Sequence, residues 1–329
     1  MTRKVSTRHL AVELTAITDA AALASFRWLG KGRKKMGDGA AVDAMRKGFM
    51  HMDIDGLVVI GEGEKDEAPM LYNGERVGNG NGPQVDVAVD PVEGTRLLAL
   101  GKPNSIAVVA LAPRGSMFNP GPAFYMNKLV VPAQARGKVN IHDPVARTLS
   151  TVAQCLNKSV EELTVFVLDK ERHTKLINDI RDVGARIQLH TDGDVAGALM
   201  AVMPGTGVDV MMGTGGTPEG VLAAAAVRVL GGEMQGLLDP QSDAEERAVR
   251  EAGFDLARVL RTEDLVASND ILFAATGITD GVFLAGVTPT PSGIKTSSMV
   301  MTGASGTVRR IESVYTPLRH SQLEVQAFA

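Results

Sequence analysis

The sequence predicts an α/β protein with mixed sheets whose N-terminal half has α+β character, and three observations carry this prediction. Beyond about residue 150, short apolar runs alternate with helical patterns, which favours a parallel or mixed sheet covered on both faces. Before residue 150, two helical patterns come first and several strands follow. Hydrophobic residues make up 44% of the chain and charged residues 22%, as in ordinary globular proteins. For a chain of 329 residues, at roughly 100–200 residues per domain, we expect an α+β domain over residues 1–150 and an α/β domain over residues 151–329.

Each element of the N-terminal half follows from a local pattern. An Ala-rich amphipathic pattern predicts a helix over residues 10–29, and a second helix is expected over residues 40–50, after Gly37-Asp38-Gly39. Residues 78–82 form a glycine-rich turn. Strands are predicted over residues 56–60, 85–89, 105–111 and 123–131.

The C-terminal half is predicted as strand–helix units followed by further sheet. From Ile271 onward, apolar and β-branched runs separated by Gly and Pro predict additional strands. Before that point, strands are expected over residues 164–168, 185–189 and 208–212, and helices over residues 174–183, 195–203 and 218–230.

Charge and composition exclude several classes of function. The net charge of −4 and the low aromatic content of 4% provide neither a basic field nor stacking platforms, so no nucleic-acid partner is expected. The single cysteine, Cys155, excludes a disulfide within the chain and fits a reducing compartment. The apolar stretch over residues 10–29 contains Glu13, Asp19 and Arg27, which fits neither a signal peptide nor a membrane span. We therefore expect a cytoplasmic protein without a membrane partner, with an organelle transit segment as the alternative.

The strongest chemical signal is the string Asp90-Pro91-Val92-Glu93-Gly94-Thr95, which directly follows an apolar strand. Pro91 fixes φ and removes a backbone donor, so a turn here can bring the two carboxylates toward one point. Hard divalent cations bind oxygen ligands, and Mg²⁺ usually takes one or two carboxylates together with a substrate phosphate. The alternative interpretation is a turn whose Asp90 caps a following helix.

This string resembles the Asp-Pro-x-Asp-Gly-Thr motif of the lithium-sensitive phosphatases, which include inositol monophosphatases and fructose bisphosphatases. Glu93 departs from the inositol phosphatase pattern, but it is normal in the class II fructose-1,6-bisphosphatases. Further segments resemble that class, in its order and over nearly the whole chain. They are residues 37–42, 61–71, 124–129, 191–194 and 213–220.

The resemblance implies a fold, a reaction and a cofactor. The fold would be the layered α-β-α-β-α sugar-phosphatase fold with mixed sheets, in which the first domain carries most metal ligands and the second carries the substrate-binding loops. The reaction would be hydrolysis of the 1-phosphate of fructose-1,6-bisphosphate in gluconeogenesis, with Mg²⁺ or Mn²⁺ as cofactor. The partner would be a small sugar bisphosphate, and we further expect a homo-oligomer.

The resemblance also implies the residues of the site. Thr95, Asp90 and Glu62 would act in the catalytic step. The metal ligands would be Asp38, Glu62, Asp90, Glu93 and Glu219. The substrate would be bound by Glu93, Gly94, Thr95, Tyr125, Lys170, Glu171, Arg172, Asp192, Gly193, Asp194 and Gly216.

Two of the implied metal ligands also have a structural interpretation. Asp38 is a plausible N-cap for a helix beginning at Ala40, and one side chain does not easily serve as both cap and ligand. Glu62 and its neighbour Glu64 stand between glycines just after a strand. The flanking glycines give the backbone conformational freedom, which lets a ligand approach the carboxylates. The alternative is a solvated acidic hairpin.

The implied substrate loops have similar alternatives. Residues 213–220 are either an anion site at a helix N-terminus or a simple turn in which Glu219 stabilises the helix dipole. Lys170 and Arg172 follow a strand end, where ligands gather in such sheets, but they also suit an exposed helix start. Tyr125 would otherwise be a half-buried strand residue.

Other functions remain as alternatives at this stage. The chain would be a related phosphatase acting on sedoheptulose-1,7-bisphosphate or inositol phosphate, or an inactive regulator that binds sugar phosphates. The complete set of acidic residues, together with Thr95, argues against a protein that only binds.

Overall fold

The computed structural model of the chain describes residues 10–62 and 71–316. The chain forms two compact units: residues up to Met117 together with those from Ser268 onward form the first, and Phe118–Ala267 form the second. The expected boundary near residue 150 differs from this division, because residue 150 lies inside helix α4 (Val145–Leu156) of the second unit. The C-terminal strands return to the first unit, where β11 (Leu272–Gly277) pairs with β4 (Ile106–Pro113).

The first unit is built on an eight-stranded mixed sheet in the order β12-β13-β11-β4-β3-β1-β2, with β14 paired to β13. Strands β1 and β3 are parallel, and the other pairs are antiparallel. Its strands are β1 (Asp55–Ile60), β2 (Arg76–Val77), β3 (Gln84–Glu93), β4 (Ile106–Pro113), β11 (Leu272–Gly277), β12 (Thr288–Thr290), β13 (Gly293–Thr302) and β14 (Thr307–Tyr315).

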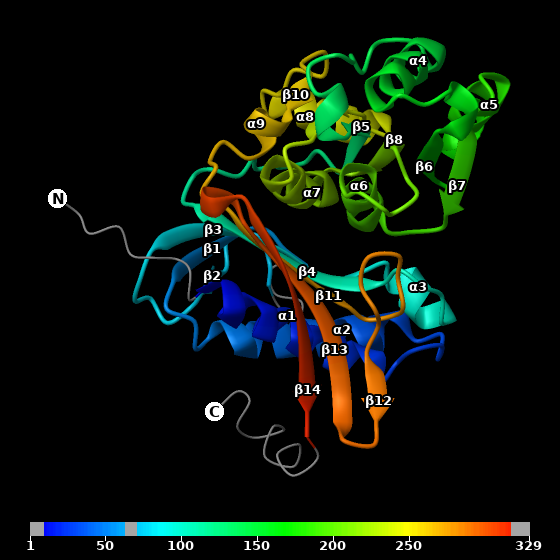
Figure 1. The fold of residues 1–329 in the computed structure, drawn as a ribbon. Coiled ribbons are helices and arrows are strands. Elements are labelled where there is room, and N and C mark those ends of the chain that lie inside the picture. The colour runs from blue at the N-terminus through cyan, green and yellow to red at the C-terminus, as the bar shows by residue number, and fades with distance from the viewer. Residues whose placement is uncertain (1–9, 63–70, 317–329) are drawn as a thin grey trace. The chain divides into compact units, whose positions relative to one another are not determined.

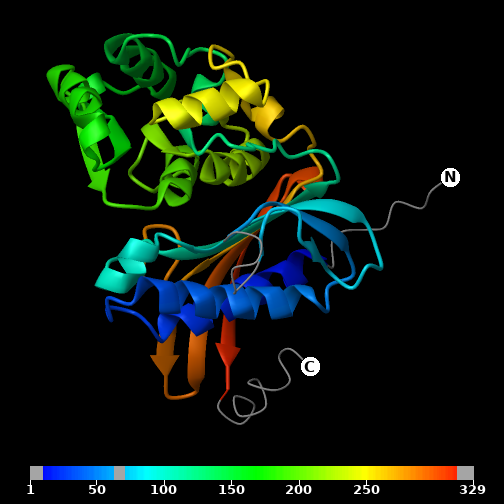
Figure 2. The same ribbon diagram turned by 180° about the vertical axis from the view of Figure 1, so that it is seen from behind.

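Helices α1 (Leu10–Phe26) and α2 (Lys34–Phe49) lie against this sheet, with the short helix α3 (Thr95–Leu100) beside α2 (Figures 1 and 2). One apolar core joins both long helices to the strands. A polar cluster lies within it, where the buried Asp19 of α1 accepts hydrogen bonds from Ser298, Thr276 and the Tyr315 hydroxyl. Burial and the neighbouring Asp19 carboxylate raise the pKa of Tyr315 above its ordinary value.

Helix α2 begins six residues earlier than the sequence pattern predicts, at Lys34 instead of Ala40. The glycine at position 37 explains the difference. A Cβ atom at Gly37 would stand 3.0 Å from Leu98 and 3.2 Å from Trp28, so this glycine allows the first turn of α2 to pack closely. Glycine in a helix costs roughly 1 kcal/mol relative to alanine. At position 37 this cost is offset by the close packing that glycine allows.

The second unit is a six-stranded mixed sheet in the order β10-β9-β5-β8-β6-β7. Strand β6 is parallel to β7 and β8, whereas β5 is antiparallel to β8 and β9. Its strands are β5 (Tyr125–Val131), β6 (Thr164–Leu168), β7 (Arg186–His190), β8 (Val210–Gly216), β9 (Glu233–Leu238) and β10 (Leu260–Arg261). Besides α4, its helices are α5 (Thr174–Asp182), α6 (Asp194–Val202), α7 (Thr217–Val229), α8 (Asp243–Glu251) and α9 (Thr262–Leu265).

Helices cover both faces of this second sheet, as the strand–helix alternation predicts. Helices α4 and α5 share a core with β5, β6 and β8, while α6 and α7 pack on the opposite face. A Cβ atom at Gly197 of α6 would overlap the ring of Phe166, so this helix lies directly on the sheet. The α/β fold class is thus confirmed, with two mixed sheets. Four single-turn 3₁₀ helices, Ala133–Ala135, Val160–Glu162, Glu171–His173 and Gly303–Ser305, complete the described secondary structure.

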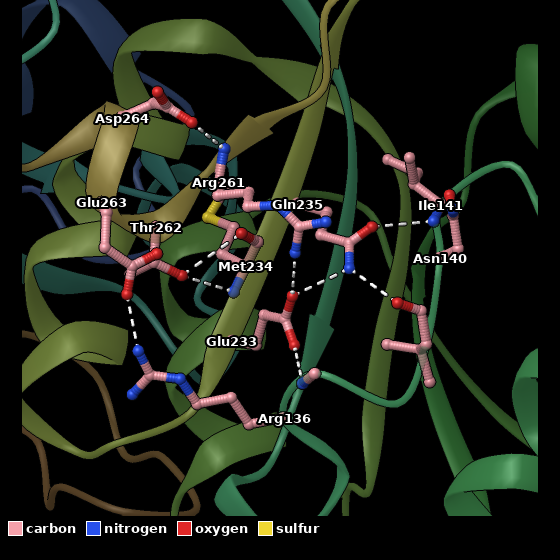
Figure 3. A network of polar contacts seen from close by, with 12 residues as sticks. Arg136, Asn140, Ile141, Glu233, Met234, Gln235, Arg261, Thr262, Glu263 and Asp264 are labelled. Atoms are coloured by element: carbon pink, nitrogen blue, oxygen red, sulfur yellow. Dashed lines mark hydrogen bonds and ion pairs between the residues drawn. The ribbon is translucent and has the colours of Figure 1, made fainter.

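A polar network fastens the segment after β5 to strand β9 (Figure 3). The buried Glu233 accepts hydrogen bonds from the backbone of Gly137, from Gln235 and from Arg261, the last at 3.1 Å. Gln235 in turn donates to the carbonyl of Val139 at 2.9 Å. Glu233 and Gln235 are buried and each has hydrogen-bond partners, so the network fixes the segment against the sheet.

None of the helices in the described part of the chain combines the length and the apolar character needed to cross a membrane.

Candidate active site

In the first unit, the carboxyl ends of β1 and β3 bring two predicted residues to the same sheet edge. The two strands are parallel, and Ile60 pairs with Ala88. Glu62 and Asp90 each lie two residues beyond this pair, Glu62 after the end of β1 and Asp90 near the end of β3, so the topology sets them at the same edge. The backbone N–H of Glu62 donates to the carbonyl of Leu71 at 2.9 Å. Glu64 lies outside the described residues.

The first part of the string, Asp90–Glu93, is a bulge in strand β3. Asp90 pairs with Val108 and Glu93 with Ile106, so two residues of β3 oppose one residue of β4. Pro91 has no N–H, which suits an irregular position in a strand. The bulge turns the strand just where both carboxylates stand.

Local bonds hold this bulge in shape. The backbone N–H of Val92 donates to Asp90 Oδ1 at 3.1 Å, so Asp90 does not cap helix α3. The residue before that helix is Gly94, whose φ of +81° lies in the left-handed region that favours glycine. Thr95 follows as the first residue of α3, and Glu93 is 4% exposed. The string therefore places a buried carboxylate, a partly exposed carboxylate and a hydroxyl within six residues.

Asp38 lies within helix α2 and is not its N-cap. The N-cap is Arg33, and the structural alternative for Asp38 was therefore wrong, because the helix begins before it. Burial raises the pKa of Asp38 to about 6. Burial disfavours the charged form, and a cation beside the carboxylate would restore it. This environment fits a metal ligand.

In the second unit, the predicted residues gather at one edge of the sheet. Strands β6, β7 and β8 are parallel and end at Leu168, His190 and Gly216. The loops that follow them carry the predicted substrate residues, as expected for an α/β sheet. Lys170 Nζ donates to the carbonyl of Thr191 at 2.7 Å, which ties the first loop to the second.

Tyr125 and Arg172 meet at this same edge. Tyr125 begins β5 and pairs with Gly216, the last residue of β8. The guanidinium of Arg172 lies 5.2 Å from the centre of the Tyr125 ring, a cation–π distance. It also donates to the carbonyl of Thr214 from Nε at 3.1 Å and from Nη2 at 2.9 Å. Three contacts therefore fix the direction of this cation, while Glu171 beside it is exposed.

A buried group of charges lies where helices α6 and α7 begin. Lys128 of β5 is 2% exposed, and its Nζ lies 2.5 Å from Oδ2 of Asp194, the first residue of α6. The carboxylate of Glu219 stands in the first turn of α7. A Cβ atom at Gly215 would overlap the Asp194 carboxylate, and one at Gly216 would overlap Glu219. The two glycines therefore leave the space that these carboxylates fill.

Glu219 has the environment expected of a cation ligand. Its Oε2 atom is buried, and within the described residues it has no hydrogen-bond partner. Burial raises the pKa of Glu219, the Asp194 carboxylate raises it further, and Lys128 only partly offsets them. One lysine thus faces two buried carboxylates, and an additional cation would neutralise the second.

The structure places the predicted site residues in two sets, one in each unit. The first unit carries Asp38, Glu62, Asp90, Glu93, Gly94 and Thr95, and the second carries Tyr125, Lys170, Glu171, Arg172, Asp192, Gly193, Asp194, Gly216 and Glu219. Across the described ranges, no group of three or more His, Cys, Asp or Glu side chains stands close enough to hold a metal ion. Asp38 and Glu219 suit a cation because burial disfavours their charged forms and, among the described residues, no nearby positive charge fully compensates them.

Sequence reasoning missed Lys128 and Asp239. Lys128 interrupts an apolar strand at a buried position, which is a signal that a charge partner exists. Asp239 follows β9 and accepts from the Thr214 hydroxyl at 2.6 Å. His173 has a structural role here, since its Nδ1 meets the carbonyl of Leu168 at 2.7 Å and its Nε2 accepts from the N–H of Thr214 at 2.8 Å.

Comparison with known proteins gives a consistent result. The family described as bacterial fructose-1,6-bisphosphatase, glpX-encoded, matches residues 8–315. Fructose-1,6-bisphosphatase 1 class 2 of Escherichia coli (strain K12) is 44% identical over 321 residues, which cover 94% of this chain and 95% of that protein. The class 2 enzymes of Escherichia coli O6:H1 and of Shigella flexneri match with the same identity and coverage.

Proposed function

The chain belongs to the family of bacterial, glpX-encoded fructose-1,6-bisphosphatases, and we propose that it hydrolyses the 1-phosphate of fructose-1,6-bisphosphate to fructose 6-phosphate and phosphate. The observation that carries this proposal is the extent of the family match, which spans residues 8–315 and so includes every predicted site residue. The string Asp90–Thr95 further supports kinship with the lithium-sensitive phosphatases.

Divalent cations would be held by carboxylates. We propose Asp38, Glu62, Asp90 and Glu93 in the first unit and Glu219 in the second as the ligands. All are oxygen donors, which suit Mg²⁺ or Mn²⁺ and do not select zinc. When bound, such ions polarise the phosphoryl oxygens and lower the pKa of a bound water.

Thr95 would position the attacking water. Its hydroxyl stands at the start of α3, directly after the bulge that carries Asp90 and Glu93. Because Gly94 fixes the turn before it, the hydroxyl has a defined place relative to those carboxylates. A hydroxyl can accept a hydrogen bond from a water while donating its own hydrogen bond to a carboxylate. No covalent intermediate with the protein is needed.

The second unit would bind the part of the substrate that does not react. Lys170 and Arg172 supply the positive charge for the second phosphate, since arginine binds phosphate through a planar fork of donors. Asp192, which is only partly buried, would accept hydrogen bonds from sugar hydroxyls. Asp194 is buried against Lys128, so we propose that it holds the loop containing Asp192 and Gly193 in place.

The metal assignment is tested by one substitution and its control on the same helix. Asp38→Asn removes the charge and keeps the shape, and Asp43→Asn makes the same change at an exposed position of α2. We expect Asp38→Asn to weaken Mn²⁺ binding, measured by electron paramagnetic resonance, and to reduce phosphate release strongly. Asp43→Asn should change neither. Unaltered Mn²⁺ binding in Asp38→Asn would remove this residue from the ligand set.

A further inference from the structure

Strand β14 forms a long edge of the first unit's sheet. It has nine residues, whereas the edge strands β2 and β12 have two and three. It pairs with β13 without a register shift, from Thr307 opposite Thr302 to Tyr315 opposite Ile294. Its other side has no strand partner among the residues that the structure describes (Figure 1).

Of the usual protections against pairing with another chain, this edge has only charge. Proteins commonly blunt edge strands by short length, by proline, by a bulge or by charged side chains. The segment Thr307–Tyr315 contains no proline, and its pairing with β13 is regular throughout. The charged residues of β14 therefore determine which strand can pair with it.

One face of β14 has a self-complementary sequence. Alternate residues Val308, Arg310, Glu312 and Val314 share this face and are exposed, the two valines at 43% and 49%. Consider a second copy of β14 that runs antiparallel, with Ile311 facing itself across a twofold axis. Val308 then faces Val314, and Arg310 faces Glu312, and the symmetry repeats each pair.

The charges select this register over its neighbours. A symmetric antiparallel pair must place one residue opposite its own copy. Centring on Arg310 places two arginines opposite each other, and centring on Glu312 places two glutamates opposite each other. Like charges directly opposite are unfavourable, whereas opposite charges and β-branched pairs are favourable. Only the register centred on Ile311 sets opposite charges across from each other and also pairs the two valines.

We propose that β14 is the interface through which two copies of this chain associate, by antiparallel pairing centred on Ile311. The two eight-stranded sheets would then continue into each other. Within one copy, Glu312 already pairs with Lys295 at 3.1 Å. In the dimer it would lie between this lysine and the Arg310 of the second copy. The proposal gives the expected homo-oligomer a specific interface, and it does not depend on the proposed hydrolysis.

Charge reversal tests the proposal through five samples measured by sedimentation velocity, the wild type among them. Glu312→Arg sets positive charges opposite each other, and Arg310→Glu sets negative charges opposite each other. We expect each single variant to have half the mass of the wild type, which for a simple dimer means 34.7 kDa. The double variant Arg310→Glu/Glu312→Arg restores opposite charges and should recover the wild-type mass. An equimolar mixture of the two single variants should also recover it.

The mixture separates an interface effect from a folding effect. A single variant that is merely misfolded would not regain the wild-type mass when it is mixed with another defective variant. Circular dichroism of each variant checks that the fold is retained. The proposal is overturned if the wild type is monomeric at micromolar concentration, or if the single variants keep its mass. It is equally overturned if neither the mixture nor the double variant recovers the wild-type mass.

Discussion

Replacing Lys128 by methionine should destabilise the protein strongly, because it removes the partner of a buried charge. The ammonium of Lys128 lies 2.5 Å from Asp194, and their side chains are 2% and 7% exposed. Methionine keeps most of the side-chain length and loses the charge. Removing one partner of a buried ion pair costs about 3–5 kcal/mol, since the other charge stays buried without compensation. Glu219 loses the same opposing charge.

A double-mutant cycle and a surface control make this prediction specific. Adding Asp194→Asn removes the uncompensated carboxylate, so the double variant should be more stable than the sum of the two single changes by about 0.5–3 kcal/mol. The control is Lys175→Met, which breaks an exposed pair with Asp179 whose side chains are 86% and 37% exposed. That change should cost about 0.3–0.5 kcal/mol. Urea unfolding followed by circular dichroism measures all four variants. A cost for Lys128→Met as small as that of the control would refute the reasoning.

Four further predictions concern pH, a buried network and two proposed site residues. Burial lowers the pKa of His173 below its ordinary 6.5. The unfolded chain therefore binds this proton more readily than the folded chain does. The free energy of unfolding should fall as the pH drops below about 6.5. His173→Gln should flatten this dependence of the urea midpoint, and an unchanged dependence would contradict the assignment. Glu233→Ala removes the acceptor of the hydrogen bonds from Gly137, Gln235 and Arg261 and should cost roughly 2 kcal/mol. Glu263→Ala, at a side chain 46% exposed, should cost less than about 1 kcal/mol, and equal thermal midpoints would argue against the network. Thr95→Ala should lower kcat with little change in KM, and Thr95→Ser should retain part of the activity; an effect on KM alone would mean that Thr95 only binds substrate. Arg172→Ala should raise KM for the bisphosphate about ten- to a hundredfold and affect a small monophosphate much less, while equal losses on both would place Arg172 elsewhere in the mechanism.

Local sequence patterns predicted most elements of the second unit, because each is a short strand or helix with its own hydrophobic periodicity. The strand Thr164–Leu168 agrees fully with the prediction, and the helix that starts at Thr174 ends one residue early. The loop that carries Lys170 and Arg172 was likewise predicted at a strand end. Where parallel strands are known to end together, residues in such loops can be assigned to one edge.

Contacts between distant residues were not predictable in this way. The first unit takes its last strands from beyond Ser268, because β11 pairs with β4. The first turn of α2 depends on packing between Gly37 and Leu98. Local sequence patterns do not include such a contact. The pair of Lys128 and Asp194 joins residues 66 positions apart. Each of these features depends on tertiary packing, which overrides propensity.

Phosphate release from a small panel of substrates tests the central claim most directly. The panel is fructose-1,6-bisphosphate, sedoheptulose-1,7-bisphosphate and inositol monophosphate, each with Mg²⁺, with Mn²⁺ or with a chelator. We predict release from fructose-1,6-bisphosphate with fructose 6-phosphate as the product, only when a divalent ion is present. Release that continues in the chelator would contradict the proposed metal ligands. No release from this substrate with either ion would contradict the proposed function itself.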